Sequence, residues 1–245
     1  MKKLSEISIN IRGVAKKFGK TVALNDFTAV FQKETLHGVI GPDGAGKTTL
    51  LRLLAGLLRP GEGNIEYFSG DNHVNQKDIR AHIGYMPASA SLYPDLSILE
   101  HLEFFRRLYR IGKAEYEDKS QTLLNMTRLT EFKDRKISQL SGGMYKKAGL
   151  ICALLRSPEV LLLDEPTNGV DPISRREFWE LLYALSYKKI LIIISTAYMD
   201  EAERCARVHL LESGKLLESG APEEVLINSG VKEFDEIFIR QQKDE

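Results

Sequence analysis

The sequence has 245 residues, of which 43% are hydrophobic and 28% charged, so it is long enough to bury a sizeable core and has the composition of a soluble globular protein. Its 34 Lys and Arg residues balance 34 Asp and Glu residues, and this removes the excess positive charge that non-specific nucleic-acid binding requires. Two cysteines, Cys152 and Cys205, are too few for a disulfide framework or an all-cysteine metal site, and they favour a reduced, cytosolic chain.

The first part of the chain has the pattern of an α/β protein. Alternating apolar and polar residues predict a strand at 7–14, and an apolar run that stops at Gly-Pro predicts a buried strand at 36–40. Leucines at helical spacing predict a helix over 48–58, which is followed by a Pro-Gly stop signal. Further strands are expected at 64–68 and 82–86.

The middle of the chain is predicted to be mostly helical. Ser97 and Glu100 have the spacing of a capping box, and the apolar residues that follow share one helical face. Two more helices are predicted over 115–129 and 142–155. Strand patterns then return at 160–163 and 189–194, on either side of a helix that opens with an Asp-Pro pair.

These elements predict one domain, 1–245, that consists of an α/β core with a helical insertion. The core is expected to comprise 1–86 and 159–245, and the helical subdomain 87–158. No segment has the roughly 20 apolar residues that a membrane-spanning helix needs. The N-terminal residues 1–6 lack the apolar stretch of a secretory signal, so any membrane role is expected to depend on a partner.

One glycine-rich segment fits the phosphate-loop pattern G-x-x-x-x-G-K-[ST] at every fixed position, between a predicted strand and a predicted helix. Glycines let backbone N–H groups converge on phosphate oxygens, Lys47 adds a positive charge, and Thr48 offers a hydroxyl to Mg²⁺. An accidental glycine turn is the alternative, which the flanking strand and helix disfavour. The expected ATP-binding residues are Gly41, Pro42, Asp43, Gly44, Ala45, Gly46, Lys47, Thr48 and Thr49.

The apolar run at 160–163 ends in two acidic residues, as in a buried strand that delivers carboxylates to a sheet edge. Asp164 is expected to hold Mg²⁺ together with Thr48, and Glu165 is placed to act as the general base that polarises an attacking water. A strand followed by a solvated acidic turn is the alternative, and the phosphate loop argues against it.

Five further motifs occur in the chain: Leu140-Ser141-Gly142-Gly143-Met144, Pro166-Thr167-Asn168-Gly169-Val170-Asp171-Pro172, Tyr85-Met86-Pro87, Leu92-Tyr93-Pro94-Asp95-Leu96 and Ser195-Thr196-Ala197-Tyr198-Met199-Asp200-Glu201-Ala202-Glu203. In their order and spacing they resemble the motifs of the nucleotide-binding subunits of ATP-binding-cassette (ABC) transporters, and the resemblance covers about 7–238. The last three motifs are similar to those of exporter-type ATPases for drugs, polysaccharides, antibiotics or sodium.

The resemblance implies an α/β fold: a P-loop NTPase (RecA-like) core with an antiparallel β subdomain and an inserted helical signature subdomain. It also implies a head-to-tail dimer with a second ATP-binding domain, identical, separate or fused, that sandwiches two ATP molecules. The helical subdomain would abut integral membrane permease subunits, which places the chain peripherally at the cytoplasmic face of a membrane. No nucleic-acid partner is implied.

The same resemblance assigns further residues to the site. Ser141, Gly142 and Gly143 would contact ATP held by the partner, and Asp171 would contact the partner cassette. Phe18 falls where the family stacks an aromatic ring on adenine, although it could instead be an apolar residue that closes the first sheet.

Two positions depart from the family pattern. Ala88 stands where the family has a glutamine that reaches Mg²⁺ and the attacking water, and Ala197 stands where it has a histidine that contacts the γ-phosphate. Alanine has no side-chain donor or acceptor. ATP binding is therefore expected to survive while hydrolysis is reduced, with Tyr198 or a water as a candidate substitute.

Functions other than an export ATPase would share part of this pattern. One is a non-hydrolysing, ATP-binding regulatory half of an asymmetric cassette pair. Another is a soluble cassette ATPase acting on DNA or ribosomes, against which the neutral charge, the single cassette and the absence of a heptad run argue. A small-molecule kinase would share the phosphate loop but not the segment 140–144.

Overall fold

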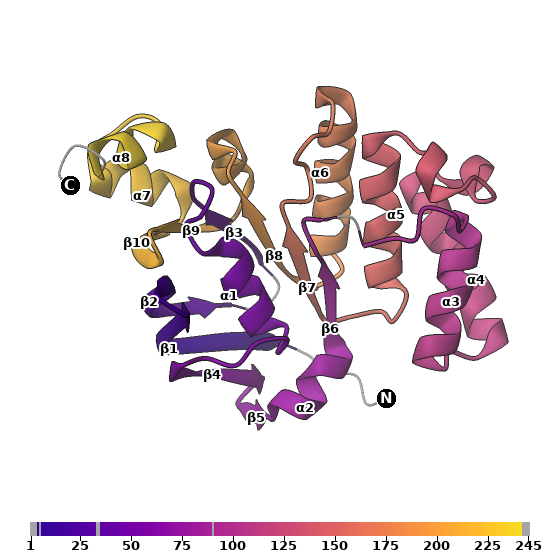
Figure 1. Cartoon of the computed structure of the whole chain (residues 1–245), viewed down its shortest axis with the longest axis horizontal. Helices are drawn as coiled ribbons and strands as arrows, with labels where there is room; N and C mark the ends of the chain where they lie inside the picture. The colour runs from indigo at the N-terminus through magenta and orange to yellow at the C-terminus, as the bar shows by residue number, and fades with distance from the viewer. Residues whose placement is uncertain (1–3, 5, 33–34, 90, 242–245) are drawn as a thin grey trace.

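The computed structural model describes residues 4, 6–32, 35–89 and 91–241, which form two β-sheets and their surrounding helices (Figure 1). Most of segment 1–6, where we expect no secretory signal, lies outside the described residues. The strands are β1 (Ile7–Phe18), β2 (Thr21–Phe31), β3 (Leu36–Ile40), β4 (Glu62–Ser69), β5 (Asn72–Val74), β6 (Ile83–Met86), β7 (Val160–Asp164), β8 (Leu191–Thr196), β9 (Arg207–Glu212) and β10 (Lys215–Gly220). The α-helices are α1 (Lys47–Leu54), α2 (Gln76–Ile79), α3 (Ile98–Tyr109), α4 (Lys113–Thr127), α5 (Gly142–Leu154), α6 (Pro172–Ser186), α7 (Pro222–Ser229) and α8 (Phe234–Gln241). Short 3₁₀ segments are η1 (Arg80–His82), η2 (Thr130–Phe132), η3 (Ile137–Gln139) and η4 (Met199–Arg204).

The larger sheet has the strand order β10-β9-β3-β8-β7-β6. Its strands run parallel to their neighbours except for β10, which pairs antiparallel with β9 at one edge. Every residue of β3, β7 and β8 is buried, which explains why these strands are near-continuous apolar runs and not alternating ones. The carboxyl ends of the parallel strands meet along one side of the sheet, where such folds bind ligands.

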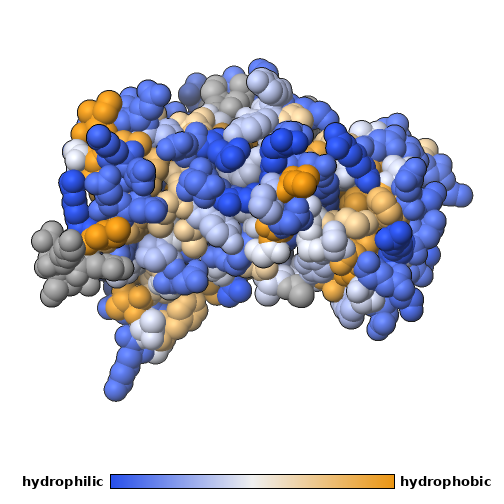
Figure 2. All heavy atoms as spheres, turned by 90° about the horizontal axis from the view of Figure 1, so that it is seen from above, coloured by the Kyte–Doolittle hydropathy of each residue, from blue (hydrophilic) through white to orange (hydrophobic). Residues whose placement is uncertain are grey.

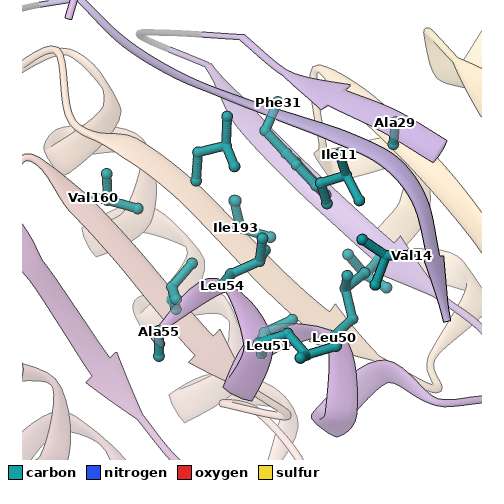
Figure 3. Packing of buried hydrophobic residues seen from close by; sticks show 14 of the residues in the cluster. Ile11, Val14, Ala29, Phe31, Leu50, Leu51, Leu54, Ala55, Val160 and Ile193 are labelled. Atoms are coloured by element: carbon teal, nitrogen blue, oxygen red, sulfur yellow. The ribbon is translucent and has the colours of Figure 1, made fainter. Parts of the chain in front are cut away.

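The smaller sheet is antiparallel, with the order β2-β1-β4-β5, and α1 packs between it and the parallel sheet. Leu50, Leu51 and Leu54 of α1 lie among Ile11 and Phe31 of the antiparallel sheet and the strands of the parallel sheet (Figure 3). Because α1 is the helix that follows the glycine-rich segment, this packing fixes the segment between the two sheets.

Helices α3, α4 and α5 form a block at one end of the molecule, beyond β6 (Figure 1). Their apolar faces build a hydrophobic cluster of their own, which includes Leu102 of α3, Leu124 of α4 and Ile151 of α5. The predicted capping box is confirmed, because the Ser97 side chain accepts from the Glu100 N–H and the Glu100 carboxylate accepts from the Ser97 N–H.

The structure contradicts the predicted ends of one helix and one strand. The helix predicted over 48–58 ends at Leu54, because Gly56 adopts a left-handed backbone with φ of 67°. β1 continues to Phe18, beyond the predicted end at residue 14, since irregularities in its pairing with β2 interrupt the alternating pattern. Sequence patterns also missed β2 and the C-terminal helices α7 and α8.

The surface in Figure 2 is mainly hydrophilic, with hydrophobic side chains in small separate groups. Within the described part of the chain, no helix combines the length and hydrophobicity that crossing a bilayer requires.

The position of α1 between two sheets generates a stability prediction. Leu51→Ala should lower the free energy of unfolding by about 2–5 kcal/mol, because a fully buried leucine is replaced and the rigid sheets cannot close the cavity. Leu57→Ala is the matched control, since Leu57 is 62% exposed and should change stability by less than about 0.5 kcal/mol. Urea denaturation followed by circular dichroism measures both, and equal effects would contradict the packing described.

Candidate functional site

The glycine-rich segment connects β3 to α1 at the carboxyl edge of the parallel sheet, and close packing requires its glycines. A side-chain carbon at Gly41 would lie 2.0 Å from the Leu211 carbonyl oxygen, and one at Gly46 would lie 2.3 Å from the Ala23 carbonyl oxygen. Gly46 also has a φ of 108°, which side chains rarely allow. The loop therefore approaches its neighbours with bare backbone.

Helix α1 begins at this loop with unpaired backbone donors. Gly46 is its N-cap residue and supplies no side-chain hydrogen bond, and the first turn contains no acidic residue. The free N–H groups and the positive end of the helix dipole thus remain available to an anion.

Lys47 is only 4% exposed, and its ammonium is held over the loop. Nζ donates to the carbonyl oxygens of Gly41 at 2.8 Å and Pro42 at 2.9 Å, and lies 3.4 Å from Oε1 of Glu165. The positive charge is therefore centred between the phosphate loop and the predicted general base.

The carboxylate of Asp164, at the end of β7, is 1% exposed, and both of its oxygens accept hydrogen bonds. Oδ1 accepts from Thr48 Oγ1 at 3.0 Å and from Ser195 Oγ at 2.6 Å, and Oδ2 accepts from Tyr85 OH at 3.4 Å. Burial and then the charge of Asp164 raise the pKa of Tyr85, so its hydroxyl keeps its proton and remains a donor. The two predicted Mg²⁺ ligands, Thr48 and Asp164, are thus brought together as a pair of hard oxygen donors.

Sequence reasoning missed Tyr85 and Ser195 as site residues. Both stand near the carboxyl ends of strands that flank β7, and Ser195 is the register partner of Asp164. A polar residue at the end of each apolar strand is the signal that could have found them.

Glu165 is fixed at its backbone as well as its side chain. Its φ is 46°, an unusual left-handed conformation for a residue with a side chain. Its N–H donates to the carbonyl oxygen and the hydroxyl of Ser195, both at 3.1 Å. Its carbonyl accepts from Lys146 Nζ at 2.9 Å, and its Oε2 accepts from Asn168 Nδ2 at 3.0 Å. Lys146 was not among the predicted site residues.

Ala88 and Ala197, where the family resemblance implies a glutamine and a histidine, have neighbours that contact Glu165 or its partners. The carbonyl oxygen of Ala88 accepts a hydrogen bond from Lys146 Nζ at 3.5 Å. Beside Ala197, the Tyr198 hydroxyl donates to Asn168 Oδ1 at 3.3 Å, and thereby supports the amide that holds Glu165.

None of the histidines substitutes for the missing one. His37 and His209 bind each other at 3.0 Å, and burial lowers the pKa of His37 to about 4 and that of His209 to about 3. His82 pairs with Glu159, His101 binds backbone near the start of α3, and His73 packs on a phenylalanine of β4.

The segment after Glu165 is joined to the one after Ala197 by a buried carboxylate. Glu201 is fully buried, and its Oε1 accepts from Thr167 Oγ1 at 2.7 Å, Arg175 Nε at 2.7 Å and Trp179 Nε1 at 3.0 Å. Sequence reasoning gave Glu201 no role, because its partners come from distant parts of the chain.

The signature residues lie at the start of α5. Ser141 is the N-cap, and its hydroxyl accepts from the Met144 N–H at 3.3 Å, while Ser141 and Gly142 are both exposed. A side-chain carbon at Gly143 would lie 2.5 Å from Ser174 of α6, so the glycine permits close packing between the two helices. Asp171 caps α6 through the N–H groups of its first turn. These residues are not brought to the phosphate loop by any described contact.

Phe18 is the last residue of β1, at the tip of the hairpin with β2. Its ring is 48% exposed and is approached by Lys16 Nζ at 5.5 Å, so it is not part of the buried core. The hairpin packs on the phosphate loop, because Ala23 and Leu24 of β2 contact Gly46.

The family described as ABC transporter matches residues 24–168. The chain is 41% identical, over 89% of its length, to the probable multidrug ABC transporter ATP-binding protein YbhF of Escherichia coli, but spans only 38% of that relative. It is 36% identical, over 87% of its length, to the Nod factor export ATP-binding protein I of Burkholderia lata, of which it covers 71%.

Solved structures share the fold. The structure of an ATP-binding subunit of an ABC transporter superposes with a TM-score of 0.81 at 26% identity, covering 97% of this chain and 99% of that one. A dimeric ATP-binding cassette in a post-hydrolysis state, bound to ADP and Pi, superposes with a TM-score of 0.76 at 25% identity. The match covers 87% of this chain and 98% of that one.

Fold and site together define the class of P-loop ATPases known as ATP-binding cassettes, which confirms the predicted fold class. The chain belongs to the ABC transporter family, as its motifs indicated.

The contacts of Lys47 generate a binding prediction. Lys47→Ala should weaken ATP binding about tenfold or more, because it removes a charge-assisted contact to phosphate worth about 1.5–3 kcal/mol. Titration with a fluorescent ATP analogue measures the affinity. Lys113→Ala is the control, since Lys113 is exposed on α4 and pairs only with Glu117 among the described residues. Unchanged affinity in Lys47→Ala would remove the phosphate-loop assignment.

Proposed function

We propose that the chain is the ATP-binding subunit of an exporter-type ABC transporter, and that it couples ATP binding and hydrolysis to transport through separate membrane subunits. The observation that carries the proposal is the convergence of the phosphate loop, the Thr48–Asp164 pair and Glu165 at one sheet edge. The name of the similar Nod factor export protein supports the direction of transport, and the name of YbhF describes a multidrug ABC transporter.

In this function the phosphate loop holds the ATP phosphates through backbone N–H groups and Lys47. Thr48 and Asp164 fit Mg²⁺, because their two oxygens lie 3.0 Å apart and a hydroxyl and a carboxylate are hard oxygen ligands. Mg²⁺, when bound, supplies neutralisation of phosphate charge. Glu165 accepts a proton from the attacking water, and the exposed ring of Phe18 stacks on adenine.

The signature residues Ser141, Gly142 and Gly143, of which the first two are exposed, are proposed to contact ATP held by a second cassette in a head-to-tail sandwich. A hydroxyl and a helix start are suited to a γ-phosphate. The dimeric post-hydrolysis neighbour supports the arrangement. The partner is a second copy, a separate cassette or a fused one, and the larger size of YbhF is compatible with the last.

The helical block is proposed to meet the membrane subunits, which places the chain peripherally on the cytoplasmic face. Tyr93 is 57% exposed, Phe104 40% and Leu108 60%, and the rings of Tyr93 and Phe104 are 5.9 Å apart. Phe105 and Tyr109 instead pack against the hydrophobic cluster of the block.

A second candidate function is a non-hydrolysing regulatory half of an asymmetric pair. Ala88 and Ala197 favour it, because the site lacks two contacts to the water and the γ-phosphate. Glu165 and its hydrogen bonds favour residual hydrolysis, so the two functions differ in the rate of turnover.

Restoring the two side chains separates these functions. The unmodified chain should hydrolyse ATP slowly, and Ala88→Gln with Ala197→His should raise turnover more together than either does alone, since both act on one transition state. Each missing contact slows chemistry by about 10²–10³. Phosphate release at saturating ATP is measured for the four proteins. An unmodified chain as fast as the double variant would show that the site is not degenerate.

Dimerisation should depend on nucleotide, because the signature binds only ATP that a partner holds. Glu165→Gln should retain ATP and accumulate whatever sandwich the chain forms alone, which we expect to be a weak homodimer or none. Light scattering with and without ATP measures this. A tight homodimer without ATP would argue against the sandwich.

A further inference from the structure

Lys146 is a buried cation that the proposed mechanism does not use. It lies in α5, six residues after the start of the signature, and is 8% exposed. Its ammonium donates to the Glu165 carbonyl at 2.9 Å and lies 3.5 Å from the Ala88 carbonyl. Among the described residues, no carboxylate oxygen lies within ion-pair distance of it.

Such an environment is unfavourable for a positive charge. Burial lowers the pKa of Lys146, and the charges of Glu165 and Asp164 oppose this only in part. An apolar side chain of similar length would be accommodated at lower cost, as for other buried charges without an ionic partner. Stability therefore gives no reason for a lysine here.

The contact between the Lys146 ammonium and the main chain of Glu165 gives a reason for a lysine at this position. Glu165 has the left-handed backbone at φ of 46°, which persists only where surrounding contacts determine it. Ser195 fixes the N–H side of this residue, and Lys146 fixes the carbonyl side. The direction of the Glu165 side chain follows from the orientation of these two peptide groups.

Lys146 also connects three parts of the chain. It belongs to the signature helix, and its ammonium reaches Glu165 after β7 and the connection after β6 that carries Ala88. Ala88 has no side chain that could make this connection, so only its carbonyl is available.

We infer that Lys146 is a positioning residue. Its ammonium holds the main chain of Glu165 and of Ala88 against the signature helix α5, and this contact orients the general base. The inference rests on the proposed role of Glu165 as general base. It makes the Lys146 ammonium the contact through which the helical block acts on Glu165.

Neighbouring Lys147 is a matched control for Lys146. It is also 8% exposed and lies on the same helix, but its ammonium pairs with the Glu177 carboxylate of α6. Lys147 thus has an ionic partner and no contact with Glu165, so its loss affects stability without touching the site.

The test compares Lys146→Met, Lys146→Arg and Lys147→Met in the full chain. For Lys146→Met we expect kcat for ATP hydrolysis to fall at least about tenfold, with KM for ATP within about threefold and Tm unchanged or higher. Lys146→Arg should recover part of kcat. Lys147→Met should lower Tm and keep kcat within about twofold. Wild-type kcat in Lys146→Met, or a joint loss of kcat and Tm that arginine does not relieve, would overturn the inference.

Hydrogen exchange of the nucleotide-free chain separates this inference from the proposed function. Lys146→Met should speed amide exchange in peptides covering 164–168, and Lys147→Met should not. Equal exchange in both variants and the wild type would overturn the positioning role. A second outcome is possible: Lys146→Met speeds exchange in 164–168, but Glu165→Gln does not lower the ATP turnover of the chain. In that case the general-base role of Glu165 is wrong and the positioning role of Lys146 stands.

Discussion

The whole site depends on the buried carboxylate of Asp164. A charge excluded from water is tolerated only when hydrogen bonds replace its hydration, and here Thr48, Ser195 and Tyr85 provide them. These donors come from the start of α1 and from β8 and β6, so one carboxylate sets the relative positions of the phosphate loop and two strands. The parallel sheet makes this possible because it brings the carboxyl ends of its strands to one edge.

The orientation of Glu165, the next residue in the chain, is determined in a different way. Its orientation comes from an uncommon backbone conformation with hydrogen bonds on both sides, and its carboxylate is supported by Asn168, which Tyr198 supports in turn. Ala88 and Ala197 stand where the family resemblance implies side chains that act on the water and the phosphate. The phosphate loop that binds nucleotide is intact in this site. The proposed hydrolysis depends on how firmly the main chain holds Glu165.

Contacts between distant segments also link the site to the rest of the fold. Glu201 gathers a threonine, an arginine and a tryptophan, and so joins the segment after Glu165 to α6 and to the segment after Ala197. Gly143 lets the signature helix pack closely on α6. The predicted dimer surface at the start of α5 and the predicted catalytic residues at the sheet edge are therefore linked by packing and hydrogen bonds within one chain.

The sequence by itself determined the local features: the phosphate loop, the Asp164–Glu165 pair after a buried strand, the Ser97–Glu100 capping box and the Asp171 cap. Each depends on residues a few positions apart, whose geometry a single turn or strand end fixes. Only the tertiary structure decided the roles of Ser195, Tyr85 and Lys146. Their partners lie 31, 79 and 19 residues away in the chain, and no local pattern encodes such contacts, because sheet order and helix packing bring them together.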